Sequence, residues 1–278
     1  MFLRSISMQM RIIWERKIAT IVFFLLFVLM LINFFTNVMI YKGSDMVNMY
    51  HPMKLLTLST YSKYSFYLLQ FYPFLVIIPA GFALFADKTL NQYIFIQARV
   101  GARNYYLGKL IGVFLVTFIV FTVPFLLEII PNYLAFPISA VSDPSNLSYY
   151  SENYFETNDT YLFSFLYVQS PYLYAVVFIV IFGIISGVLA MFTVAISAFP
   201  IKFKVLLFLP IYLLLNGVAM LDHLLPTLKI ETDYFIYLRF YEPLHGVTNN
   251  LIALFTFIIL IAYLSISIMI FKIRRGEM

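Results

Sequence analysis

Long apolar runs separated by short polar connections dominate the pattern along the chain. Several runs reach the roughly 20 residues that a helix needs to cross a bilayer. Apolar residues are continuous within each run rather than alternating, which favours helices over the strands of an outer-membrane barrel. We predict six spans at residues 18–40, 64–86, 110–130, 172–199, 205–221 and 250–271.

The composition supports a membrane protein. Of the 278 residues, 63% are hydrophobic and only 11% are charged. A soluble domain of this composition would expose a large continuous apolar patch. We therefore expect an all-α polytopic membrane protein, with residues 1–278 as a single transmembrane domain. Cysteine is absent, which excludes disulfides and thiolate metal sites.

The basic residues fall mainly on one side of the predicted spans. Of the 18 Lys and Arg residues, 13 lie in the amino-terminal segment, the second-to-third and fourth-to-fifth connections and the carboxyl-terminal tail. Cytoplasmic connections carry such an excess of Lys and Arg. Both termini are therefore expected in the cytoplasm, and the protein in a plasma membrane.

The first 16 residues are too polar for a span. Their apolar side chains recur at helical spacing, which predicts an amphipathic helix lying in the membrane interface with Trp14 at headgroup depth. The alternative is a charged leader that only sets the topology. The residues of the apolar face are Phe2, Leu3, Ile6, Met10, Ile13 and Trp14.

A compact basic stretch, QARVGARNYYLGKL at positions 97–110, lies between two of these runs. It follows an acidic residue, Asp87, and a short segment with helical character, and its basic and aromatic positions are Arg99, Arg103, Tyr106 and Lys109. This run resembles the second-type permeases of ATP-binding-cassette exporters. Six spans, cytoplasmic termini and an amphipathic amino-terminal helix match the layout of that family, which is bacterial. Asp87-Lys88-Thr89 stands where the family often has Glu and Gly-Thr.

The resemblance implies a role for the connection 87–109. In such permeases a short cytoplasmic coupling helix sits in a groove of a separate ATPase subunit, and an apolar centre with a polar rim suits such a contact. The alternative for Arg99, Arg103 and Lys109 is that each only anchors the chain at the lipid headgroups. The expected docking residues are Asp87, Thr89, Asn91, Gln92, Tyr93, Phe95, Arg99 and Arg103.

The chain has no phosphate-binding loop of its own. Its Gly108-Lys109 pair is followed by Leu110 and lacks the upstream glycine of that motif. The resemblance implies that ATP and Mg²⁺ bind to a partner ATPase, present in two copies, and that a second permease, identical or homologous, completes the pathway. No metal, cofactor or nucleic acid is expected on this chain.

Small residues mark one candidate packing face. Gly183, Gly187 and Ala190 share a face of the fourth span, and small residues let helix backbones approach closely in lipid. The face packs either within the chain or across a dimer. Gly108 and Gly112 have the same spacing but begin at the interface, so their signal is weaker.

Three polar residues are candidates for the pathway or an outer gate. Glu128 lies late in the third span, where an ionisable group is a functional candidate by default. Asn216 lies near the outer end of the fifth span, and Asp222 follows it. The alternatives are a headgroup position for Glu128 and a capped span end for the other two.

Two extracellular segments, 136–171 and 222–248, are rich in aromatic and acidic residues. For the second, the resemblance implies two short re-entrant helices, and the alternative is an amphipathic helix on the outer surface. Acidic outer loops and aromatic spans favour export of an amphipathic, cationic peptide, as in antimicrobial resistance, or of a lipid-like compound. An integral-membrane enzyme and a proton-coupled carrier remain alternatives, although catalytic motifs and clear internal repeats are lacking.

Overall fold

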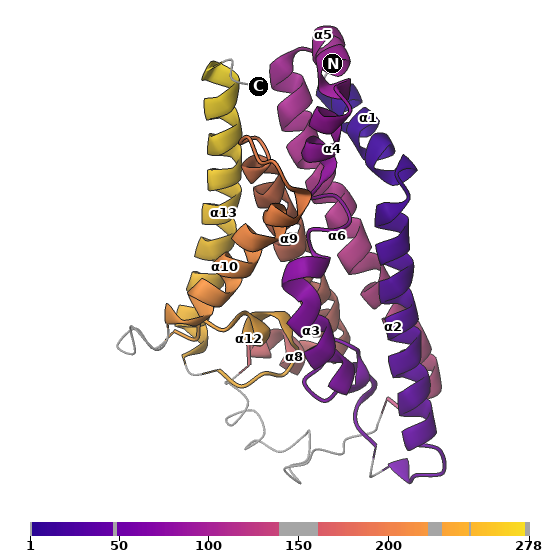
Figure 1. Ribbon diagram of the computed structural model, residues 1–278. Coiled ribbons are helices and arrows are strands. Elements are labelled where there is room, and N and C mark those ends of the chain that lie inside the picture. The colour runs from indigo at the N-terminus through magenta and orange to yellow at the C-terminus, as the bar shows by residue number, and fades with distance from the viewer. Residues whose placement is uncertain (1, 47–48, 139–160, 222–229, 245, 276–278) are drawn as a thin grey trace.

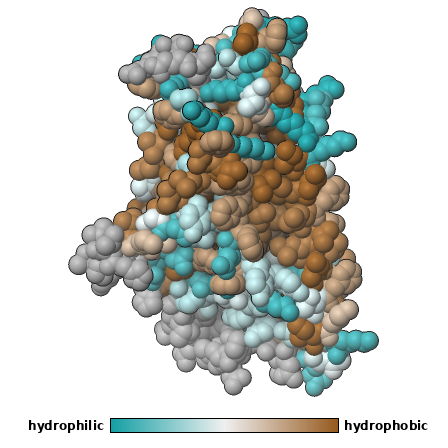
Figure 2. Space-filling view, viewed as in Figure 1, coloured by the Kyte–Doolittle hydropathy of each residue, from teal (hydrophilic) through white to brown (hydrophobic). Residues whose placement is uncertain are grey.

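The computed structural model describes residues 2–46, 49–138, 161–221, 230–244 and 246–275, which form a bundle of helices (Figure 1). Four of its helices are long and apolar enough to cross a membrane. Figure 2 shows a broad hydrophobic band across the middle of the molecule, with hydrophilic residues gathered towards the two ends. The four helices are α2 (Ile18–Ile40), α6 (Ala102–Ala135), α9 (Pro171–Ile196) and α13 (Val247–Arg275).

Shorter helices complete the described part of the bundle. The amino terminus, α5 and the carboxyl end of α13 lie at one end, which we term the basic end (Figure 1). The segments α8 and α12 lie towards the other, which we term the opposite end. The shorter helices are α1 (Phe2–Glu15), η2 (Pro52–Leu55), α3 (Lys63–Leu75), α4 (Ala83–Thr89), α5 (Gln92–Val100), α8 (Ser164–Gln169), η3 (Lys204–Leu207), α10 (Phe208–Ala219) and α12 (Tyr234–Leu238).

The predicted second span, 64–86, is not one helix. Helix α3 ends at Leu75, and helical structure resumes only at Ala83 in α4. Pro79 accounts for the break, because a proline ring clashes with the carbonyl four residues earlier, here that of Leu75. Turn-type hydrogen bonds serve the backbone in between, such as Gly81 N to Ile77 O at 2.8 Å.

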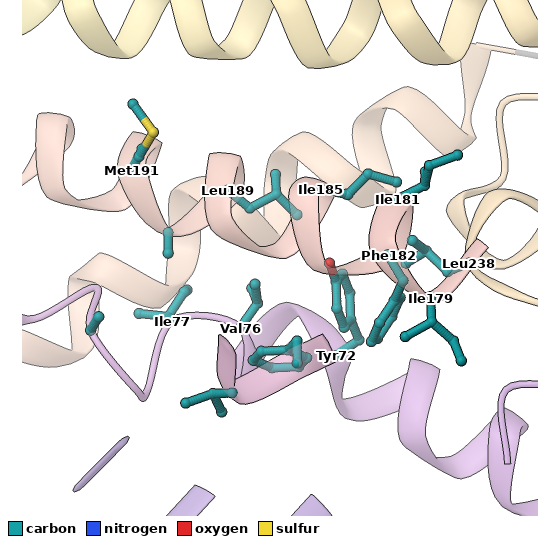
Figure 3. Close-up of a cluster of buried hydrophobic side chains, with 14 of the residues drawn as sticks. Tyr72, Val76, Ile77, Ile179, Ile181, Phe182, Ile185, Leu189, Met191 and Leu238 are labelled. Atoms are coloured by element: carbon teal, nitrogen blue, oxygen red, sulfur yellow. The ribbon is translucent and has the colours of Figure 1, made fainter. Parts of the chain in front are cut away.

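The break is buried against α9. Figure 3 shows Val76 and Ile77 within the hydrophobic cluster that the residues of α9 line, and both are fully buried. Just before the break, the hydroxyls of Tyr72 and Ser186 are 2.9 Å apart. Non-helical backbone inside a bundle is tolerated when protein surrounds it, so this contact with α9 explains how the interruption is stable here.

The predicted fifth span is also shorter than expected. Helix α10 has 12 residues, which at 1.5 Å per residue extend about 18 Å. The turn of 3₁₀-helix η3 precedes it. Pro210 occupies an early position in α10, where a proline is tolerated. By length, therefore, α10 alone does not cross the roughly 30 Å of a hydrocarbon core.

Close packing of α6 on α9 forms the centre of the bundle. A Cβ atom on Gly183 would lie 3.0 Å from the ring of Phe118, and one on Gly187 would lie 2.6 Å from the ring of Phe114. Ala190, one turn further on, is fully buried. The small face of the fourth predicted span thus contacts α6 of the same chain.

A second pair of glycines, Gly108 and Gly112 of α6, lies against α1. The Ser5 hydroxyl donates to the carbonyl of Asn104 over 2.9 Å, and Gln9 lies against Gly112. The side of α1 that faces the protein therefore carries Ser5, Gln9 and Ile13, all buried. Of the predicted apolar face, only Ile13 is buried, whereas Leu3 is 79% exposed. Gly108 and Gly112 of α6, whose spacing was the weaker signal in the sequence, form the surface on which the amino-terminal helix packs.

The opposite end is closed by segments from three parts of the chain. Phe240 N donates to Leu58 O over 2.9 Å, and Thr60 N donates to Phe240 O over 3.1 Å. Tyr161 forms an isolated bridge with Pro243. Of the predicted outer segments, residues 139–160 and 222–229 lie outside the described residues. In the described part of 222–248, α12 is a single short helix.

Candidate functional site

The α4–α5 segment is the part of the basic end that the sequence singled out. Asn91 turns the chain between the two helices with a φ of 53°, and Gly101 separates α5 from α6 with a φ of +83°. A side chain at position 101 would meet no atom within 4 Å, so this conformation, and not space, is what favours glycine there. Two tight turns therefore hold α5 as a separate short helix.

Helix α5 presents apolar side chains outward. No residue of α5 is buried, and the exposed fractions are 52% for Ile94 and 72% for Phe95. Tyr93 is half-buried and packs against the core. Gln97 hydrogen-bonds through Nε2 to the hydroxyl of Tyr106, which ties α5 to α6. The helix is thus fixed on its inner side and open on its outer side.

The structure divides the eight predicted docking residues into two groups. Asp87 is fully buried and faces inward, and Tyr93 is half-buried. The remaining six residues are exposed, and the hydroxyl of Thr89 donates to the carbonyl of Ala86 over 3.0 Å. The exposed six are Thr89, Asn91, Gln92, Phe95, Arg99 and Arg103.

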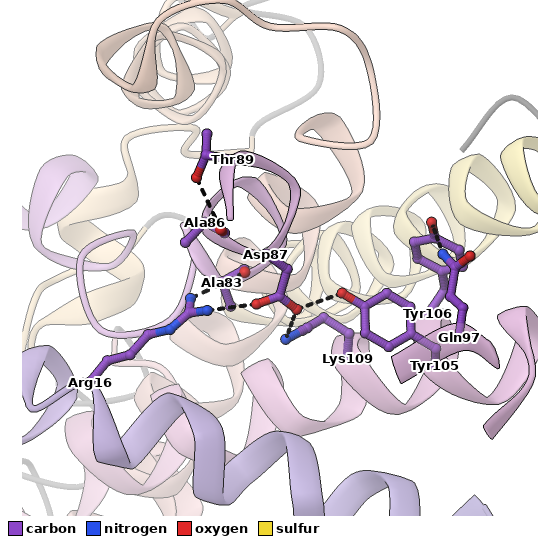
Figure 4. Close-up of polar contacts among 9 residues, drawn as sticks. All are labelled: Arg16, Ala83, Ala86, Asp87, Thr89, Gln97, Tyr105, Tyr106 and Lys109. Atoms are coloured by element: carbon purple, nitrogen blue, oxygen red, sulfur yellow. Dashed lines mark hydrogen bonds and ion pairs between the residues drawn. The ribbon is translucent and has the colours of Figure 1, made fainter. Parts of the chain in front are cut away.

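Asp87 is the centre of a buried ionic network, which Figure 4 shows. Its Oδ1 atom lies 2.6 Å from Arg16 Nη2, and its Oδ2 atom lies 2.6 Å from Lys109 Nζ. The hydroxyl of Tyr105 also donates to Oδ2, over 2.5 Å. Arg16 donates through Nη1 to the carbonyl of Ala83 over 3.3 Å. One carboxylate thus joins the α1–α2 junction, α4 and α6.

This network corrects the role predicted for Lys109. The sequence placed Lys109 with Arg99 and Arg103 at the lipid headgroups, but its side chain is fully buried against Asp87. Burial of a charge is costly unless the charge is paired, and here two cations share one carboxylate that also accepts a hydrogen bond from a tyrosine hydroxyl. The spacing of Tyr105 and Lys109 places both on one face of a helix, but whether that face meets a buried acid depends on tertiary packing.

Because the network touches three elements, it couples the position of α4 to that of α1 and α6. The start of α6 also receives α1, since Gly108 beside Lys109 contacts Ser5. A force on α5 therefore reaches α4, through the turn at Asn91, and then α1 and α6 through Asp87. The contacts of Asp87 thus connect the segment that carries α5 to the amino-terminal helix and to a long helix of the bundle.

Glu128 organises the opposite end. It is fully buried in α6, and its Oε1 atom accepts hydrogen bonds from Thr57 N at 2.9 Å and from Thr57 Oγ1 at 2.7 Å. Asn33 of α2 donates to the same atom over 3.0 Å and to Leu55 O over 2.8 Å. Glu128 thus fastens the connection between α2 and α3 to two long helices.

The other residues predicted for the pathway are placed less centrally. Asn216 donates to the carbonyl of Tyr212 in its own helix, over 2.8 Å. Asp222 lies outside the described residues.

His51 lies in the connection between α2 and α3, where it caps η2 by accepting a hydrogen bond from Met53 N at 3.2 Å. Burial, with a smaller effect of Lys54, lowers the pKa of His51 to about 4, so it is neutral at physiological pH.

Comparison of the chain with family models, with curated proteins and with solved structures gives no match. Function is therefore inferred from the residues of the chain and their arrangement.

Proposed function

We propose that this chain is the permease subunit of an ATP-binding-cassette exporter, that it forms half of a dimeric pathway, and that a separate ATPase drives it. The observation that carries the proposal is α5, a short helix with exposed apolar side chains at the basic end, joined to the spans through Asp87. In this assignment the basic end and both termini face the cytoplasm of a bacterial cell.

The outer side of α5 supports docking of a protein. Ile94 and Phe95 are exposed, while Gln92 and Arg99 provide polar groups at the two ends of the helix. Interfaces of this kind have an apolar centre and a polar rim. Because the sequence lacks a phosphate-binding loop, the partner that docks here would supply ATP and Mg²⁺ binding.

The broken second span supports transport over membrane-bound catalysis. Discontinuous helices occur in transporters, where non-helical backbone near the midplane allows one part of the bundle to move against another. The non-helical residues 76–82 connect α3 to α4, which carries Asp87. Movement of the coupling segment would therefore act on a predicted span whose helix is already interrupted.

An apolar cavity supports a lipid-like or amphipathic cargo. It has a volume of about 100 Å³ and lies between α9, α10, α12 and α13. Ile185, Leu215 and Phe257 line its apolar part, and Tyr237 and Glu231 lie at its polar part. A small apolar cavity with a few polar groups suits an apolar group with a polar end. The acidic loop that suggests a cationic peptide lies mostly outside the described residues.

The docking assignment is tested by placing charge on the outer side of α5. Ile94→Asp and Phe95→Asp should release the ATPase from the solubilised complex, because a carboxylate would be buried unpaired in the contact. The chain itself should still insert and fold, since both side chains point to solvent. The measurement is the ATP hydrolysis that co-purifies with the tagged permease.

The matched control is Ile138→Asp. Ile138 is 51% exposed, like Ile94, but it follows the carboxyl end of α6, whereas α5 precedes the amino end of that helix. It should leave the co-purifying hydrolysis unchanged. Full retention of hydrolysis in Phe95→Asp, or equal loss in Ile138→Asp, would remove α5 as the docking surface.

A further inference from the structure

A second cavity lies at the basic end, and nothing above gives it a role. Its volume is about 370 Å³, and it opens between the α4–α5 segment and the turn from α9 to η3. One part of its lining is aromatic and the other is polar and basic. The residues that matter are Phe85, Tyr93 and Phe199 on the first part and Lys88, Thr89 and Lys202 on the second.

Two lysines line this cavity, and a third lies against one of its aromatic residues. Lys88 of α4 lies in its lining and donates to the carbonyls of Ser197, at 3.2 Å, and Ala198, at 2.8 Å. Lys202, on the turn after α9, is exposed in the same lining. Lys272 near the end of α13 places Nζ 4.7 Å from the centre of the Phe199 ring.

Within the described lining, no Asp or Glu accompanies Lys88 and Lys202. Asp87, the neighbour of Lys88, is turned away towards Arg16 and Lys109. Burial, and then the charge of Lys272, lower the pKa of Lys88. An anion in the cavity would offset this repulsion, since an opposite charge nearby favours the charged lysine.

The cavity lies where lipid headgroups are expected. The long helices α9 and α13 end beside it, and α13 exposes large apolar side chains such as Tyr263 and Phe271 along its outer surface. Basic pockets between membrane helices at the cytoplasmic side bind anionic headgroups. The aromatic part of the lining is what separates a lipid from a free anion, because only a lipid brings apolar groups to meet it.

We propose that this cavity binds the phosphate of an anionic phospholipid, with Lys88 and Lys202 at the phosphate and Phe85 and Phe199 at the apolar part of the molecule. The inference requires only that the chain resides in a membrane, and it does not depend on transport or on an ATPase.

The test uses the full chain in a neutral detergent, titrated with phosphatidylglycerol or phosphatidylcholine while bound lipid is counted by native mass spectrometry. Phosphatidylglycerol should bind in preference to phosphatidylcholine. Lys202→Gln should weaken its apparent affinity about fivefold, which corresponds to about 1 kcal/mol for one basic residue near the headgroup. Lys202 is chosen because its side chain is exposed and its replacement leaves the bonds of Lys88 intact.

Lys17→Gln is the matched control, since Lys17 is also exposed and near the basic end but lies on the α1–α2 junction. It should leave the affinity unchanged, and Lys202→Arg should retain it. Equal weakening by Lys17→Gln, or equal binding of the two lipids, would overturn the proposal.

Two further arms distinguish other ligands. If inorganic phosphate displaces phosphatidylglycerol and raises the melting temperature as much, the site holds a free anion and the lipid assignment is wrong. If a hexaglutamate peptide binds where phosphatidylglycerol does not, the lysines serve an acidic protein and the assignment is equally wrong.

Discussion

Replacing Asp87 with alanine is expected to destabilise the folded chain by about 3–5 kcal/mol, the usual cost of breaking a buried ion pair from one side. Lys109 is fully buried and would remain beside Arg16 without the carboxylate that they share. The free energy of unfolding in mixed micelles of neutral and denaturing detergent measures the effect.

Glu15→Gln is the control for Asp87→Ala. Glu15 pairs with Arg11 over 2.8 Å on the exposed side of α1, where such pairs contribute about 0.5 kcal/mol or less. Adding Lys109→Met to Asp87→Ala should restore more than about 1 kcal/mol, because it removes the charge left unpaired. Similar losses from Asp87→Ala and Glu15→Gln would show that the network does not hold the basic end together.

Glu128→Ala is expected to cost about 2–6 kcal/mol. Its Oε1 atom accepts three hydrogen bonds, and each buried donor left without an acceptor costs about 1–3 kcal/mol. The two donors on Thr57 would lose their partner, so the connection between α2 and α3 should also loosen around Thr57. The free energy of unfolding and the rate of proteolysis within residues 49–62 measure these two effects.

Glu128→Gln separates the hydrogen bonds from the charge. Glutamine keeps an acceptor oxygen at the same position, so it should cost about 1 kcal/mol or less and leave proteolysis unchanged. If Glu128→Gln were as damaging as Glu128→Ala, the charge of Glu128 and not its contacts with Thr57 would be what matters at the opposite end.

The sequence predicts the long helices well and the interrupted ones poorly. The predictions for 18–40 and 172–199 overlap α2 and α9 closely, because uninterrupted apolar runs of that length have few other stable structures. Hydropathy continues unchanged across 76–82, where Pro79 ends α3, so only the proline marked the break. Similarly, the run at 205–221 does not show that its helix has 12 residues.

The sequence predicts the exposed side of the α4–α5 segment, but it does not predict the buried contacts of Asp87. Exposure of Phe95 follows from a short apolar segment between two polar turns. Whether a lysine at the entry to a span points to headgroups or to a buried acid depends on tertiary packing, and Lys109 was assigned to the wrong side for this reason. Arg16, distant in sequence from Asp87, carried no signal of their contact.

The packing of α1 on α6 shows why the pair of glycines in α6 was given too little weight. Gly108 and Gly112 were judged weak because they begin at the membrane interface. They nevertheless contact another helix closely, since Ser5 and Gln9 of α1 pack against them. Small residues permit close approach of helices at any depth, so their position along the span was the wrong criterion.

The mass of the intact complex, purified through a tag on this chain and measured by native mass spectrometry, tests most directly whether the protein is half of an ATP-driven permease. We predict two permease chains, both of 32.4 kDa or one of them a homologue, together with two copies of an ATPase subunit. A single copy of this chain that transports its cargo without any ATPase subunit would contradict the proposed function.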